Sequence, residues 1–244
     1  NFLVVTNRNY KELVLEHLPE LKENQVLCEP IGRNTAPCIA YAAYSLLKRD
    51  PEANMIVTPS DHLVLNEIDF HAIVKESLEF AVENGALMTI GIEPNRPETG
   101  YGYIQKSNGD VISRVKCFTE KPNLELAQAF VDCGEFFWNS GILVWKAQTF
   151  RQEMEKHLPE VTGLFKGWEN AIGTDMEEEF ILKVFTECPN ISINYGVMEK
   201  TDRAWIYPAH FGWQDIGTWE SLYNYIPKDQ DGNAVSVEKV LIEN

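Results

Sequence analysis

Two acidic residues, Asp61 and Asp215, each follow an apolar segment at a turn, where they could hold a divalent cation. Asp61 comes after the strand-like residues 55–58, and Asp215 lies between Gly212 and Gly217. Each acid taken alone also fits a turn or a helix cap. Two carboxylates at strand ends on one sheet face could share Mg²⁺, which takes oxygen ligands and leaves room for phosphate oxygens. The pair therefore predicts a metal site for chemistry on phosphate groups.

Two acid–base pairs stand at the ends of other strand-like segments. Glu120 and Lys121 belong to the sequence FTEKP, and Glu199 and Lys200 belong to VMEKTD. A carboxylate such as that of Glu120 could accept hydrogen bonds from two adjacent sugar hydroxyls, and the neighbouring lysine could meet a phosphate. A surface ion pair is the alternative interpretation of such a pair.

Small residues and an amide lie beside aromatic residues at two further places. Gly102 is part of GYGY, and Asn139 is part of WNSG. This combination suits a sugar pocket, although each motif also fits a β-bulge or a packing contact.

Short β-rich segments alternate with amphipathic helical segments along the chain, a pattern typical of an α/β fold with a mostly parallel sheet. Such sheets bind ligands beyond the carboxyl ends of their strands, where Asp61 is expected. Residues 96–122 interrupt the alternation, because they predict two antiparallel strands joined at a Ser-Asn-Gly-Asp turn. We expect strands at 2–5, 25–28, 55–58 and 86–92, and helices from about residue 9, from 34 or 35 to 49, over 69–84 and within 147–188.

The composition limits the classes of function. The 244 residues include 21 basic and 37 acidic side chains, and the net charge of −16 argues against binding to nucleic acid or to an anionic membrane. No apolar run approaches the roughly 20 residues that span a bilayer. Five scattered cysteines without a CxxC pair indicate reduced thiols, and five histidines show no zinc-site spacing. We therefore expect a soluble, cytoplasmic protein.

Seven motifs occur in the order found in the mannose-1-phosphate guanylyltransferases, which are sugar nucleotidyltransferases. They are EPIGRNTAP, PSDH, TGYGYI, FTEKP, FFWNSGI, VMEK and GWQDIGTW, and the resemblance covers roughly residues 2–226. It implies a nucleotide-binding, Rossmann-like mixed sheet of the nucleotidyltransferase type, with residues 96–122 as an inserted sugar-binding hairpin. It also implies a Mg²⁺-dependent enzyme of GDP-mannose biosynthesis that binds GTP, mannose 1-phosphate and GDP-mannose.

The resemblance also implies a role for each matching residue. Asp61 and Asp215 would hold the catalytic Mg²⁺. The residues implied near the guanine base are Arg33, Asn34 and Thr35. Those implied at the mannose site are Gly102, Glu120 and Asn139, with Lys121 and Lys200 close to the sugar phosphate, and Glu199 is assigned to substrate binding more generally. One departure is Asn194, where the family is expected to have an aspartate.

The implied reaction is an in-line attack by a phosphate oxygen of mannose 1-phosphate on the α-phosphorus of GTP, with pyrophosphate as the leaving group. No covalent enzyme intermediate is needed, so the protein would act by positioning the substrates and offsetting the repulsion between two anions. Mg²⁺ on the two aspartates, together with Lys121 and Lys200, would supply the positive charge.

The family opens with a strand and a glycine-rich loop that wraps the triphosphate, and no such loop occurs in this sequence. We therefore expect that an N-terminal βα unit is missing and that residues 1–244 alone are a poor catalyst. Residues 1–228 are assigned to the catalytic domain and 229–244 to a linker or the start of a C-terminal module. The oligomeric state stays open, with a homodimer among the options.

Two other functions stay open from the sequence. The chain could be a nucleotidyltransferase for another sugar phosphate or base, which a comparison of GTP with dTTP and UTP would separate. It could also be a non-catalytic regulatory subunit that binds a sugar nucleotide without Mg²⁺-dependent release of pyrophosphate.

Overall fold

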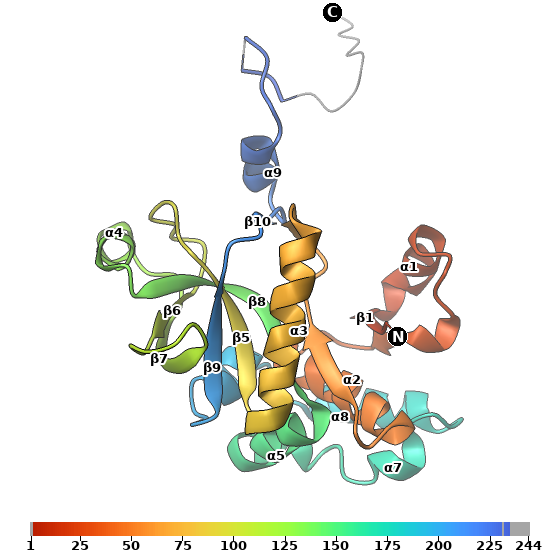
Figure 1. The fold of residues 1–244 in the computed structure, drawn as a ribbon. Coiled ribbons are helices and arrows are strands. Elements are labelled where there is room, and N and C mark those ends of the chain that lie inside the picture. Colours follow the sequence, from red (N-terminus) through yellow and green to blue (C-terminus); the bar gives the residue numbers. More distant parts are fainter. Residues whose placement is uncertain (1, 231, 235–244) are drawn as a thin grey trace, which may run out of the picture.

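The computed structural model describes residues 2–230 and 232–234, and its centre is a six-stranded mixed sheet (Figure 1). The strand order is β3 (Asn54–Val57), β8 (Phe136–Lys146), β5 (Leu87–Ile92), β9 (Ala204–Ala209), β7 (Ser113–Thr119) and β6 (Tyr103–Lys106). β6 pairs with β7 and also with residues 136–138 at the start of β8. The sheet therefore curls back on the long strand β8.

Strand direction in this sheet differs from the expectation. β5 and β9 are parallel, but β8 runs antiparallel to β3, β5 and β6, and β7 runs antiparallel to β6 and β9. The prediction of a mostly parallel sheet is thus wrong for these six strands. The reason is that the chain reaches β8 after the β6–β7 hairpin and the helix at 124–133, and β8 then lies between β3 and β5. A local pattern of strands and helices does not reveal this placement.

Two short strand pairs accompany the main sheet. β1 (Val4–Asn7) and β2 (Val26–Glu29) form a parallel pair, and among the described residues neither strand is hydrogen-bonded to the six-stranded sheet. β4 (His62–Val64) and β10 (Trp213–Asp215) form an antiparallel pair. The second pair joins two turns that are far apart in the sequence.

The helices are α1 (Lys11–His17), α2 (Thr35–Arg49), α3 (Glu67–Asn84), α4 (Leu124–Cys133), α5 (Ala147–His157), α6 (Pro159–Thr162), α7 (Trp168–Ala171), α8 (Glu177–Glu187) and α9 (Trp219–Tyr225), with 3₁₀ turns η1 (Arg8–Tyr10) and η2 (Glu23–Gln25) and the π-helical turn η3 (Asn194–Met198). Of these, α3 packs on one face of the sheet and α5 on the other, whereas α1 and α9 lie away from it (Figure 1). In the part of the chain that the structure describes, no helix is both long and apolar enough to cross a membrane.

Strand β8 separates the two halves of the hydrophobic core. Leu143 and Trp145 face the cluster built with α2, α5 and α8, whereas Ile142 and Val144 face the opposite side, where α3 packs. Successive strand side chains point to opposite faces, so a strand that is covered on both faces needs an unbroken apolar run. This explains the sequence Ile-Leu-Val-Trp at 142–145.

Gly91 marks the tightest approach within the sheet and gives a stability test. A Cβ atom at this position would lie 2.5 Å from Ile206 Cδ1 and 2.8 Å from Phe137 Cβ. We expect Gly91→Ala to lower the free energy of unfolding by about 1–3 kcal/mol, because the added methyl group overpacks a buried site. Urea unfolding of this variant and of Gly32→Ala, whose Cβ has no neighbour within 4 Å, provides the measurement and its control. Equal stability of the two variants would contradict this packing.

Candidate active site

The β4–β10 pair brings Asp61 and Asp215 together. Asp215 lies opposite His62 in the strand register, and the Ile216 backbone N–H donates to the Asp61 carbonyl oxygen at 3.1 Å. One potential ligand atom from each of Asp61, His62 and Asp215 lies within 4.8 Å of the others. The side chain of Asp61 is 57% exposed and Asp215 is half-buried, so the pair is open to a ligand from solvent.

Gly217 keeps the space between the two carboxylates open. Its backbone N–H donates to Asp215 Oδ1 at 2.9 Å and so orients that carboxylate. A Cβ atom at Gly217 would lie 2.6 Å from Asp61 Oδ2 and 3.1 Å from Asp215 Oδ1. Only glycine leaves both oxygens in these positions.

His62 supports the two acids and is a poor metal ligand in this arrangement. Trp213 Nε1 donates to His62 Nδ1 at 3.0 Å, which places the imidazole hydrogen on Nε2, 3.8 Å from Asp61 Oδ1. Burial lowers the pKa of His62, although the charges of Asp215 and Asp61 oppose this, and the lower pKa favours the neutral ring. Nδ1 therefore accepts from Trp213 and Nε2 carries the hydrogen, so neither ring nitrogen offers a free lone pair to a metal ion. The donor set that remains is two carboxylates, which fits a hard cation such as Mg²⁺.

A second cluster contains Gly102, Glu120 and Asn139. The Asn139 backbone N–H donates to the Gly102 carbonyl oxygen at 2.8 Å, and the Asn139 side-chain oxygen accepts from the Gly141 N–H at 3.1 Å. A Cβ atom at Gly102 would lie 3.1 Å from Glu120 Oε2. The carboxylate of Glu120 and the Cβ atom of Asn139 thus both lie close to the bare backbone of Gly102.

Glu199 and Lys200 lie near this second cluster. Burial raises the pKa of Glu199, the negative charge of Glu120 raises it further, and the ammonium group of Lys200 acts in the opposite direction. Lys121 follows Glu120 directly, with an exposed side chain and a left-handed backbone at φ +39°. Glu120 follows β7, whereas Glu199 follows the π-helical turn η3 rather than the expected strand, and the charge of Glu120 acts on Glu199.

Gly141 and a row of aromatic rings connect the two clusters. A Cβ atom at Gly141 would lie 3.1 Å from Pro59 and 3.9 Å from His62. The ring of Tyr101 stands edge-on to Trp138 at 5.4 Å and to Trp213 at 5.3 Å. The aspartates and the Gly102 cluster consequently belong to one continuous region.

Arg33, Asn34 and Thr35 have mainly structural contacts. The Arg33 guanidinium donates to the carbonyl oxygens of Phe185 and Thr186 at 2.7 and 2.9 Å, near the end of α8. Asn34 caps α2 with φ at +66°, and Thr35 Oγ1 accepts from the Ile193 N–H at 2.9 Å. Among the described residues, these side-chain bonds join the start of α2 to the 185–193 region rather than to either cluster.

Sequence reasoning did not single out His62, Tyr101 or Trp213, which connect and support the predicted residues. His62 is held by the hydrogen bond from Trp213 and lies beside Asp61. The available signal was adjacency, since His62 follows Asp61 and Tyr101 precedes Gly102.

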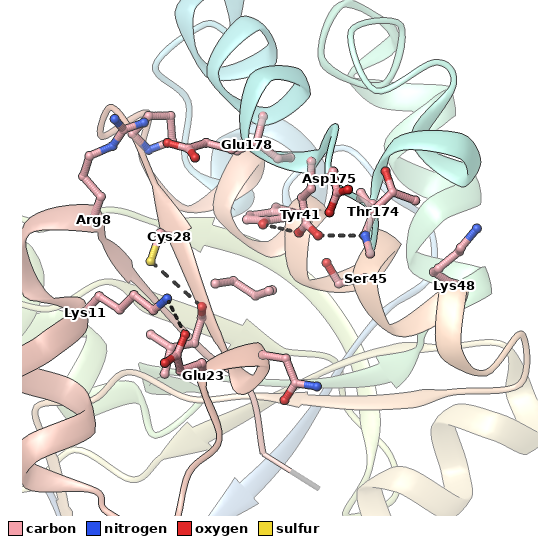
Figure 2. Close-up of a pocket in the computed structure, with 18 of the residues that line it drawn as sticks. Arg8, Lys11, Glu23, Cys28, Tyr41, Ser45, Lys48, Thr174, Asp175 and Glu178 are labelled. Atoms are coloured by element: carbon pink, nitrogen blue, oxygen red, sulfur yellow. Dashed lines mark hydrogen bonds and ion pairs between the residues drawn. The ribbon is translucent and has the colours of Figure 1, made fainter.

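A separate pocket of about 650 Å³ lies between α1, β2, α2 and residues 172–181 (Figure 2). None of the predicted site residues lines it. It is lined by both signs of charge, and several charged groups have partners: Lys11 lies 3.5 Å from Glu23, and Glu177 accepts from the Tyr41 hydroxyl at 2.5 Å and from the Gly173 N–H at 2.7 Å. Because acids and bases are balanced, this pocket shows no preference for a polyanion.

The sequence of the chain matches the nucleotidyl transferase family profile over residues 1–232. The chain belongs to the nucleotidyl transferase family. It is 39% identical to a mannose-1-phosphate guanylyltransferase of Escherichia coli, over 99% of this chain and 54% of that protein. It is 38% identical to the xanthan biosynthesis protein XanB of Xanthomonas campestris, over 95% of this chain and 50% of that protein. The chain thus spans about half the length of the curated relatives that it matches.

Solved structures support the fold of this nucleotidyl transferase. A protein described as a mannose-1-phosphate geranyltransferase from Thermus thermophilus superposes with a TM-score of 0.80 at 30% identity, covering 91% of this chain and 63% of that one. A Helicobacter pylori protein described as a mannose-6-phosphate isomerase gives 0.73 at 30% identity, covering 87% and 84%. The predicted family is confirmed, as is an α/β nucleotidyltransferase-type fold with a mixed sheet.

The role of Gly217 gives a test of the paired carboxylates. We expect Gly217→Ala to weaken Mn²⁺ binding by at least about tenfold, because the methyl group displaces Asp61 and Asp215 from one another. Titration followed by electron paramagnetic resonance measures the affinity, and Gly32→Ala serves as the control. Unchanged Mn²⁺ affinity in Gly217→Ala would show that the two acids do not act together.

Proposed function

We propose that this chain is the catalytic core of a mannose-1-phosphate guanylyltransferase, which converts GTP and mannose 1-phosphate into GDP-mannose and pyrophosphate. The observation that carries the proposal is the convergence of Asp61 and Asp215 beside the cluster of Gly102, Glu120 and Asn139. Identities of 37–39% to curated relatives of that name support the choice of substrates.

The reaction needs close approach of two anions. A phosphate oxygen of mannose 1-phosphate attacks the α-phosphorus of GTP, and the bond from that phosphorus to the pyrophosphate oxygen breaks. Glu120 and Glu199 accept hydrogen bonds from sugar hydroxyls, and Asn139 orients the sugar against the open backbone of Gly102. Lys121 and Lys200 offset the charge of the sugar phosphate.

Asp61 and Asp215 are the residues that would hold Mg²⁺ in this enzyme. When bound, the ion supplies positive charge to the phosphate oxygens. The chain's own contribution is to keep the two carboxylates in place: Gly217 leaves them room, and His62, fixed by Trp213, lies beside Asp61.

The triphosphate and guanine contacts form a further part of the proposal. In the described structure the β1–β2 pair is not hydrogen-bonded to the main sheet, and β3 is the last strand at one edge of that sheet. The unpaired backbone groups of such an edge can accept a further strand. Arg33, Asn34 and Thr35 would lie near guanine, with their hydrogen bonds fixing the shape of that segment.

The remaining parts of the proposal concern the whole protein. We assign residues 1–228 to the catalytic domain and 229–244 to a linker or the start of a C-terminal module, and residues 231 and 235–244 lie outside the described part. We assign the enzyme to the cytoplasm because all five cysteines are free thiols.

The two acids give the first test of the function. We expect Asp61→Asn and Asp215→Asn each to lower Mg²⁺-dependent release of pyrophosphate from GTP and mannose 1-phosphate by about 100-fold or more, because each removes charge that the transition state needs. Asp175→Asn is a matched control on an exposed acid outside this site. Normal turnover by either variant, or by the wild type in EDTA, would contradict the proposal.

The choice of base gives a second test. We expect GTP to support release of pyrophosphate at least about tenfold faster than UTP or dTTP, because a site shaped for one base leaves polar groups unpaired with another. Comparing the three nucleotides with mannose 1-phosphate in the same assay provides the measurement. Equal rates with all three would contradict the proposed base.

A further inference from the structure

Glu153 is a buried acid on α5, behind the turn that carries Glu199 and Lys200. It is 3% exposed, in a protein whose other acids are mostly at the surface. Burying a carboxylate away from water is costly unless partners compensate for the lost hydration. Its partners therefore indicate what the acid holds in place.

Those partners lie immediately after the Glu199–Lys200 pair. Glu153 Oε2 accepts from the Thr201 hydroxyl at 2.6 Å, and Glu153 Oε1 lies 3.3 Å from Arg203 Nε. The same hydroxyl accepts from the Arg203 backbone N–H at 3.0 Å. His157 Nε2 is 3.2 Å from Glu153 Oε2, without the alignment of a hydrogen bond. One buried carboxylate thus holds two positions of the segment 201–203.

The turn is held from its other side by η3. The backbone N–H groups of Lys200 and Thr201 both donate to the Val197 carbonyl oxygen at 2.9 Å, and the Glu199 N–H donates to the Asn194 carbonyl oxygen at 2.9 Å. Val197 is fully buried. The backbone of Glu199 and Lys200 therefore lies between two fixed points, whereas both of their side chains are exposed.

We propose that Glu153 is a positioning residue, which fixes the turn at 199–201 so that Glu199 and Lys200 face Glu120 and the sugar phosphate. The inference rests on the proposed function, because that function assigns a substrate to Glu199 and Lys200. An apolar side chain could fill the same volume without the cost of desolvation, but it could not hold the Thr201 hydroxyl and Arg203 at one fixed distance. Glu153 itself does not touch the substrate.

Substitutions at Thr201 test the proposal with little change in side-chain volume, because valine removes the hydroxyl group and serine keeps it. In the natural full-length protein, we expect Thr201→Val to raise the KM for mannose 1-phosphate by about tenfold, because Lys200 loses its fixed position. The KM for GTP should stay within about twofold, since GTP meets other residues. Thr201→Ser, which keeps the hydroxyl, should restore the wild-type KM. Glu153→Gln should resemble Thr201→Val, and Glu155→Gln, an exposed acid on the same helix that pairs with Arg151 at 2.9 Å, should be unaffected.

Hydrogen exchange of the amides of 198–203 provides a measurement that needs no substrate. We expect faster exchange in Thr201→Val than in Thr201→Ser. Equal exchange, or an equal rise of both KM values, or a lower melting temperature with unchanged KM values, would overturn the positioning role. If Glu153→Gln fails to fold, the comparison of Thr201→Val with Thr201→Ser still tests the positioning role. If the wild type accepts no sugar 1-phosphate, the proposed function fails. The rates of amide hydrogen exchange in residues 198–203 then test by themselves whether Glu153 holds the turn.

Discussion

The repulsion between Asp61 and Asp215 is the constraint on which the rest of the site depends. Two like charges about 4 Å apart repel by about 1 kcal/mol in bulk water, and more strongly where protein excludes water. The fold nevertheless holds their ligand atoms within 4.8 Å, through the β4–β10 pair and the Ile216–Asp61 hydrogen bond. A pair of acids held close against its own repulsion is a natural place for a divalent cation, whose binding would relieve the repulsion.

Rigid neighbours keep that pair aligned with the proposed sugar region. Trp213 holds His62 beside Asp61, and Tyr101 packs edge-on between Trp213 and Trp138, the residue before Asn139. Large aromatic side chains lose few rotatable bonds when they are ordered, and edge-on pairs add stability beyond their buried area. Movement of one cluster relative to the other would therefore disturb a packed core rather than a flexible loop.

Because the whole chain is strongly acidic, binding of a polyanionic substrate would depend on positive charges close to the site. A protein with a net charge of −16 repels polyanions at long range, and salt screens that repulsion beyond roughly 8–10 Å. At short range, the proposed site would rely on Lys121 and Lys200 and on a cation held by the two aspartates. The exact position of each positive charge then matters more than their number, which gives a buried acid such as Glu153 a reason to fix the turn next to Lys200.

The sequence by itself determined most of the elements and the residue types of the site, although the segment before Glu199 is the π-helical turn η3 and not the expected strand. The cap at Asn34 and the end of the helix at Arg49 follow from local chemistry, and the order of the motifs identified the family. The tertiary structure alone decided the direction of β8, the engagement of Arg33 with α8 and the hydrogen bond between His62 and Trp213. These features depend on residues far apart in the chain, whose spacing in the sequence carries no periodic signal, so only the packed fold shows which of them meet.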